Sequence, residues 1–259
     1  MTRVGDLRAL AVDLVGALRR EELAFMAAAI AYYAFVTAIP LVLVGVAVAT
    51  AVGGEALAQE LVAGLRGVLT RDAAAVLESA LTSSAGRSEA TVVGLAVLAW
   101  SGLRLFRAIE TAFARIYGTR GESTLPERIA RALVAFLAIG VGTIATVVLA
   151  VALPLATLPL AGFLGTVLAA ATLAALFLPL YVLLPAGDHG IRETLPGALL
   201  AGGGWGVLGA VFGVYADNAS AFELYGVLGG VLLLLTFLYL GGLVVILGAV
   251  LNATLATGE

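Results

Sequence analysis

The chain contains no cysteine and no lysine, and its only histidine is His189. The absence of cysteine excludes disulfides, thiol nucleophiles and cysteine-bound metals. Charged residues make up 12% of the 259 residues, hydrophobic residues make up 62%, and the mean hydropathy is +1.11. Soluble domains are about 25% charged, so a soluble enzyme of ordinary composition is excluded. The composition indicates an all-α, polytopic membrane protein.

Residues that carry catalytic or cofactor chemistry are equally scarce. All 14 basic residues are arginines, and 17 acidic residues give a net charge of −3. This balance is unsuited to nucleic acid, which requires a basic surface. No His, Asp and Glu cluster has metal-ligand spacing, and no glycine-rich loop of the Walker type occurs. We therefore expect no enzyme activity, no metal, no cofactor, no nucleic-acid partner and no ATP hydrolysis by this chain.

The apolar stretches predict one membrane domain over residues 1–259. A bilayer core needs about 20 residues of apolar helix. The fifth stretch begins at Pro196, a residue type favoured in the first turn of a helix. Residues 1–22 predict an amphipathic helix on the membrane surface, and residues 53–89 an outer helical segment too polar to cross. The six expected transmembrane helices are 24–52, 91–116, 130–154, 162–184, 196–216 and 224–255.

The arginines set the expected orientation. With the N-terminus inside, eleven arginines fall on cytoplasmic pieces and only Arg66, Arg71 and Arg87 fall outside. Cytoplasmic loops of membrane proteins are enriched in arginine and lysine. We therefore expect a plasma-membrane protein with both termini in the cytoplasm.

Charge inside the second apolar stretch is the strongest functional signal. Thr91 to Arg104 is too short to cross a membrane alone, so the hydrocarbon should extend past Arg104. Arg107 and Glu110 lie three residues apart on one helical face, and Arg115 follows. The arginines either snorkel to the inner headgroups or line the cytoplasmic mouth of a path for an anionic headgroup or solute.

Hydroxyl groups precede a proline in the first stretch. Tyr32, Tyr33 and Thr37 come before Pro40, which is expected to kink the helix. The tyrosines belong either to the inner aromatic belt or to a substrate cavity.

Small residues form stripes on two of the predicted spans. Gly202, Gly206, Gly209 and Gly213 recur along the fifth, and Ala27, Ala31, Ala34 and Ala38 along the first. Such stripes favour close helix packing in lipid, and a sliding interface in a transporter is the alternative. An outer polar turn and the terminal segment add further candidates: Asn218, Glu223, Tyr225, Gly226, Gly229, Gly230, Tyr239 and Asn252.

Several segments, taken in order along the chain, resemble the YihY/BrkB family of inner-membrane proteins. They are Ala27-Ala28-Ala29-Ile30-Ala31-Tyr32-Tyr33 leading to Pro40, Leu180-Tyr181-Val182-Leu183-Leu184-Pro185 with Leu195-Pro196-Gly197-Ala198, and Tyr225-Gly226-Val227-Leu228-Gly229-Gly230 with Tyr239 and Leu247-Gly248-Ala249-Val250-Leu251-Asn252. The chain departs from the family pattern at Ala114, where Asn is usual, at Val250, where Glu is frequent, and at Phe237, where Trp is frequent.

The resemblance implies a six-span envelope protein. Members of the family have been called virulence factors, linked to lipid export, or labelled ribonuclease BN. A metal-dependent nuclease needs a ligand cluster, and this sequence has one histidine, so the ribonuclease interpretation is disfavoured. We expect a transporter or flippase-like protein for an anionic amphiphile or lipid, with membrane lipids as partners and a homo-oligomer or another protein partner as further options. The alternative is a non-transporting scaffold that recruits partners through the arginine-rich segment Arg104–Arg131.

Overall fold

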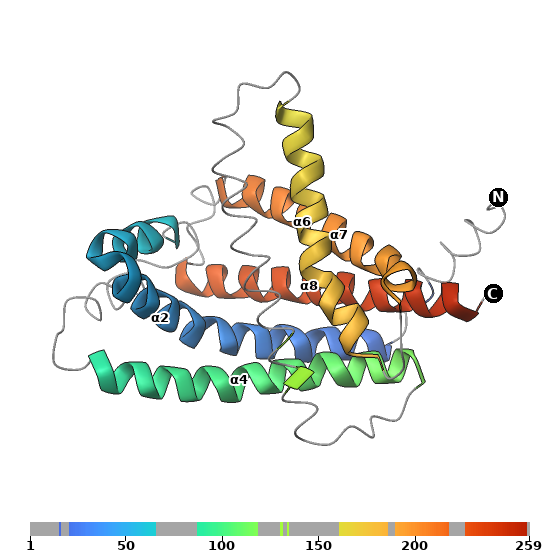
Figure 1. Cartoon of the computed structure of the whole chain (residues 1–259), viewed down its shortest axis with the longest axis horizontal. Coiled ribbons are helices and arrows are strands. Elements are labelled where there is room, and N and C mark those ends of the chain that lie inside the picture. The colour runs from blue at the N-terminus through green and yellow to red at the C-terminus, as the bar shows by residue number, and fades with distance from the viewer. Residues whose placement is uncertain are drawn as a thin grey trace. The chain divides into compact units, whose positions relative to one another are not determined.

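The fold was analysed in a computed structural model (Figure 1), which describes Gly16, residues 21–65, 87–118, 130, 131, 134, 161–185, 190–217 and 226–257. These residues form helices and short connections, and no strand occurs among them. Most of three predicted elements lies outside the described residues: the surface helix 1–22, the outer segment 53–89 and the span 130–154. The described helices are α2 (Glu21–Leu65), α4 (Arg87–Ile116), α6 (Ala161–Leu183), α7 (Ile191–Asp217) and α8 (Gly226–Thr257).

Three helices within the described ranges are long and apolar enough to cross a membrane. They are Glu22–Val46 in α2, Ile191–Val214 in α7 and Gly229–Ala256 in α8. The described apolar part of α6, Ala171–Leu183, is shorter, and α4 does not meet the same criteria. The all-helical membrane class is thus confirmed, and the six-span arrangement stays a prediction.

The chain divides into two compact units. The first contains residues 1–30, 106–212 and 239–259, and the second contains residues 31–105 and 213–238. Helices α2, α4, α7 and α8 each contribute to both units, and α6 belongs to the first alone.

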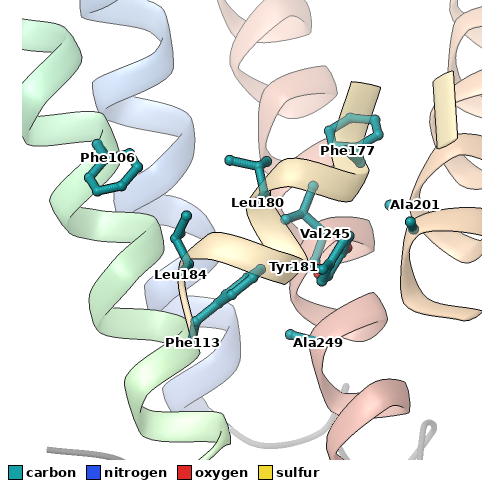
Figure 2. Packing of buried hydrophobic residues seen from close by; sticks show 10 residues of the cluster. Phe106, Phe113, Phe177, Leu180, Tyr181, Leu184, Ala201, Val245 and Ala249 are labelled. Carbon is teal, nitrogen blue, oxygen red and sulfur yellow. The ribbon is translucent and has the colours of Figure 1, made fainter. Parts of the chain in front are cut away.

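The core of the first unit is aromatic and aliphatic, and it is built from α4, α6, α7 and α8 (Figure 2). Tyr181 and Phe113 are fully buried within it. Their rings stack with centroids 5.4 Å apart, which joins α6 to α4. Small residues on α7 and α8, including Ala198, Ala201 and Ala249, are also buried and let the helices approach closely.

Helix α7 begins earlier than its sequence suggests. The predicted start at Pro196 is wrong, because the helix starts at Ile191 and Pro196 lies inside it. Gly190 acts as the N-cap: its carbonyl accepts from the N–H of Glu193 at 3.1 Å, and its N–H donates to the Glu193 carboxylate at 3.3 Å. This reciprocal pairing caps a helix whose first residues are polar. A search for apolar stretches does not detect such residues as part of the helix.

In the second unit, the break in α2 is at a glycine and not at the proline. Pro40 is buried and sits within the helix, and the residue with non-helical backbone angles is Gly54. Gly54 has φ +70° and ψ −168°, a conformation that costs glycine little and other residues much. The ribbon of α2 turns in its last part in Figure 1. Helical backbone therefore continues in α2 well past Pro40.

Candidate functional site

A buried amide joins α8 to the beginning of α7 in the first unit. Asn252 is only 3% exposed. Its Oδ1 accepts from the N–H of Gly197 at 2.7 Å, and its Nδ2 donates to the carbonyl of Thr194 at 3.1 Å. Pro196 lies between these two residues and supplies no N–H of its own, so Asn252 reinforces α7 where its hydrogen-bond ladder is interrupted.

Two glycines allow α7 and α8 to touch at the same place. A Cβ built on Gly197 would collide with the carbonyl oxygen of Gly248 and with the amide of Asn252. A Cβ on Gly248 would collide with the hydroxyl of Tyr181, which donates to the carbonyl of Val245 at 2.8 Å. Side chains larger than hydrogen are therefore excluded from both positions.

Tyr117, in the turn that directly follows α4, lies beside the same polar contacts. Its ring lies 6.4 Å from that of Phe113, and its buried hydroxyl lies beside the side chain of Asn252. The three C-terminal segments that carry the family resemblance, around Tyr181, Gly197 and Asn252, therefore meet in space. Sequence reasoning selected Asn252 but missed Tyr181, Gly197 and Gly248 as its neighbours, although all of them stand in the quoted motifs.

An exposed ion pair ties α2 to α4. Arg115 donates from Nη2 to Oε1 of Glu22 at 2.8 Å and from Nε to Oε2 at 3.1 Å. The two side chains are 63% and 66% exposed. Arg115, predicted to line a path, is thus engaged with a carboxylate at the surface.

In the second unit, Arg104 lies over an aromatic ring. Its guanidinium carbon is 4.6 Å from the centroid of Trp100, a cation–π distance, and Trp100 is 56% exposed. Side chains on a helix tilt toward its N-terminus, and this contact with the residue four positions earlier follows that direction.

The remaining predicted residues of α4 are at its surface or partly covered. Arg107 is exposed, and its carbonyl accepts from the hydroxyl of Thr111 at 2.7 Å. Glu110 is half-buried. Because Arg104, Arg107, Thr111 and Arg115 are all exposed and recur every three or four residues, they share one face of α4.

The hydroxyl-bearing residues of α2 do not converge on one point. Tyr32 is 59% exposed, and its ring makes an edge contact with Tyr33 at 5.3 Å. Thr37 is buried and donates to the carbonyl of Tyr33 at 2.6 Å, so its hydroxyl is satisfied within the helix. Pro40 is also buried.

The glycine stripe of α7 divides into a packed part and an open part. A Cβ on Gly202 would lie 2.5 Å from the backbone nitrogen of Ala174 in α6, and one on Gly206 would make an ordinary contact with Leu173. Around Gly209 and Gly213, no described atom lies within 4 Å of such a Cβ. Of the alanine stripe, Ala27 lies next to Gly242 of α8: a Cβ on Gly242 would lie 3.2 Å from the carbonyl oxygen of Ala27.

The outer turn and terminal motif are only partly described. Asn218, Glu223 and Tyr225 lie outside the described residues, as does His189. Of the others, Gly226 and Gly229 lie in the first turns of α8, Gly230 is exposed, and Tyr239 is half-buried further along the helix. Within the described ranges, no group of three or more His, Cys, Asp and Glu could hold a metal ion.

Comparison with known proteins gives one family over nearly the whole chain. A family model described as virulence factor BrkB matches residues 14–259. A UPF0761 membrane protein of Pseudoalteromonas translucida (strain TAC 125) is 26% identical over 248 residues, which cover 91% of this chain and 82% of the relative.

A second relative matches over a shorter stretch. The ribonuclease-like protein YfkH of Bacillus subtilis (strain 168) is 35% identical over 80 residues, which are 30% of this chain and 29% of that protein. No solved structure matches the chain.

Proposed function

The chain belongs to the BrkB family of membrane proteins, and we propose that it moves an anionic amphiphile, such as a phospholipid, between the leaflets of the plasma membrane. The path for the headgroup is the exposed arginine face of α4, and no ATPase activity of the chain is required. The proposal also retains the six-span arrangement with both termini in the cytoplasm.

The helix ends of the first unit support this topology. In an alternating six-span protein with a cytoplasmic N-terminus, the starts of α2 and α7 and the ends of α4, α6 and α8 all lie at the inner face. The observed contacts join such ends: Glu22 with Arg115, and Gly197 with Asn252. The stack of Phe113 on Tyr181 likewise joins the last turns of α4 and α6.

The length of α4 supports a membrane-spanning role for that helix. From Arg87 to Arg115 it measures about 42 Å at about 1.5 Å per residue, and a bilayer with its headgroups is about 40–45 Å thick. Within the second unit, α4 lies beside the apolar part of α2, where Gly94 is next to Val44, and within the first unit Arg115 pairs with Glu22.

A membrane-spanning α4 would carry Arg104 near the middle of the bilayer. Along α4, Arg104 lies about 15 Å from Gly94 and about 17 Å from Arg115. Along α2, Tyr33 is about 17 Å from both Glu22 and Val44. Around Tyr33, α2 carries no charged residue.

The cation–π contact of Arg104 with Trp100 is the observation that carries the proposal. A snorkelling arginine at this position would extend toward the cytoplasmic end of α4, where the nearest headgroups lie. The guanidinium instead lies back over Trp100, about 6 Å further from that end. An exposed cation held at mid-depth is costly in lipid, and it offers a phosphate a partner halfway across.

Lipid movement in reconstituted vesicles tests this function. Purified protein is placed in phosphatidylcholine vesicles with a trace of phosphatidylglycerol labelled with a nitrobenzoxadiazole fluorophore on its acyl chain, and dithionite bleaches the outer leaflet. We expect bleaching beyond the outer-leaflet half with the native protein and a clear reduction in Arg104→Gln. Arg192→Gln, which removes an exposed arginine at the start of α7, should behave like the native protein.

Absence of movement with folded, monodisperse protein would contradict the proposal. Crosslinking of a stoichiometric partner to the segment Arg104–Arg131 would then support the scaffold alternative. Degradation of tRNA by protein free of contaminating ribonuclease would favour the nuclease interpretation.

A further inference from the structure

The Glu22–Arg115 pair has the geometry of an occupied anion site. Two nitrogens of the guanidinium each face a different carboxylate oxygen, at 2.8 and 3.1 Å. This two-pronged arrangement is also the one by which arginine binds a phosphate group. Resting on the proposed function, we infer that Arg115 is the cytoplasmic docking site for the phosphate of an anionic phospholipid, and that Glu22 occupies it as an intramolecular counter-ion.

Exposure makes the exchange of Glu22 for a phosphate feasible. Both side chains are about two thirds exposed, at 63% and 66%, and an ion pair in that setting contributes little to stability. The two residues lie on different helices, α2 and α4, so the carboxylate can leave Arg115 without a change in the backbone of α4. An anionic headgroup also brings a full charge to the same donors.

The position of Arg115 connects the docking site with the path. Arg115 is the last member of the exposed face that contains Thr111, Arg107 and Arg104. Successive members are about 5–6 Å apart along the helix surface. A phosphate released from Arg115 therefore has its next cationic partner at Arg107. Glu22 limits the entry of phosphate because it neutralises Arg115.

Lipid binding to purified protein tests the inference independently of transport. Protein in a neutral detergent is titrated with phosphatidylglycerol or phosphatidylcholine, and bound lipid is counted by native mass spectrometry. We expect Glu22→Gln to bind phosphatidylglycerol about threefold more tightly and Arg115→Gln to lose the preference over phosphatidylcholine. Glu193→Gln is the matched control, because it removes an equal charge from another exposed carboxylate of the first unit.

A double variant guards against loss of fold. Glu22→Arg combined with Arg115→Glu retains the pair but reverses its direction, and it should bind no more phosphatidylglycerol than Arg115→Gln. Equal binding by the native protein and Glu22→Gln, or an equal gain in Glu193→Gln, would overturn the inference. So would full displacement of the lipid by inorganic phosphate at constant ionic strength, which would assign the site to the free anion.

The two proposals fail in different ways. If Glu22→Gln binds more lipid but vesicles show no lipid movement, the docking inference is supported and the proposed function is contradicted. If movement depends on Arg104 while Glu22→Gln leaves binding unchanged, the function stands and the docking inference falls.

Discussion

Asn252 and Gly197 are 55 positions apart in the chain, yet the Asn252 amide oxygen accepts the Gly197 backbone N–H at 2.7 Å. Together with the bond from Nδ2 to Thr194, it fixes α8 against the part of α7 that contains Pro196. A buried polar side chain in an apolar bundle is stabilising only when its groups are paired, and both polar atoms of this amide are.

Replacing Asn252 by alanine should destabilise the protein. The change removes two interhelical hydrogen bonds, and we expect a loss of about 1–2 kcal/mol in the free energy of unfolding. Unfolding by sodium dodecyl sulfate, followed by circular dichroism, measures this. The control is Thr254→Ala, because the Thr254 hydroxyl donates to the carbonyl of Val250 within its own helix. Equal effects of the two substitutions would contradict the bridging role of Asn252.

Alanine substitution should separate the packed glycines from the open ones. At Gly197 the new methyl group would meet the backbone of Gly248, which cannot move without shifting α8. We expect Gly197→Ala to cost about 1–3 kcal/mol through overpacking. Gly209→Ala should be neutral or stabilising, because that position is open and alanine favours helix. Unfolding in sodium dodecyl sulfate measures the stability of both variants. An unchanged stability in Gly197→Ala would refute the close approach of α7 and α8.

The depth of Trp100 can be measured, because the chain has only two tryptophans. In Trp205→Phe, Trp100 is the sole emitter, and we expect stronger quenching by lipids brominated deep in the acyl chain than by lipids brominated near the headgroup. The reason is that Trp100 lies about 20 Å from Arg87 and about 22 Å from Arg115 along α4. Trp205 donates to the carbonyl of Gly241 at 3.2 Å, so retention of fold is checked by circular dichroism. Preferential quenching by shallow bromines would place Trp100 at the interface and favour snorkelling.

Much of the helical framework follows from the sequence. The long apolar runs locate α6 and α8 to within two residues of the stretches 162–184 and 224–255, because hydrophobicity alone marks such helices. The start of α7 is missed because its first residues are held by the polar cap formed between Gly190 and Glu193. The sequence analysis expected the break in α2 at Pro40, but Pro40 lies within the helix and the non-helical residue is Gly54.

The candidate site is less predictable than the helices. Arg104, Arg107 and Arg115 stand out because charge is rare in an apolar stretch. The contacts between helices do not stand out in the sequence, because the residues that form them are far apart in the chain. Arg115 and Glu22 are 93 positions apart, and Tyr181 and Val245 are 64 apart. Such pairs depend on how the helices pack, which periodicity within one helix does not specify.

Charge reversal at Arg104 tests whether the lipid headgroup moves along α4. The vesicle experiment is repeated with Arg104→Glu, using labelled phosphatidylglycerol and a labelled cationic lipid in parallel. A headgroup path along α4 predicts that the variant moves phosphatidylglycerol more slowly than the native protein and moves the cationic lipid faster. Unchanged rates for both lipids, from a variant that remains folded and monodisperse, would contradict a path that passes Arg104.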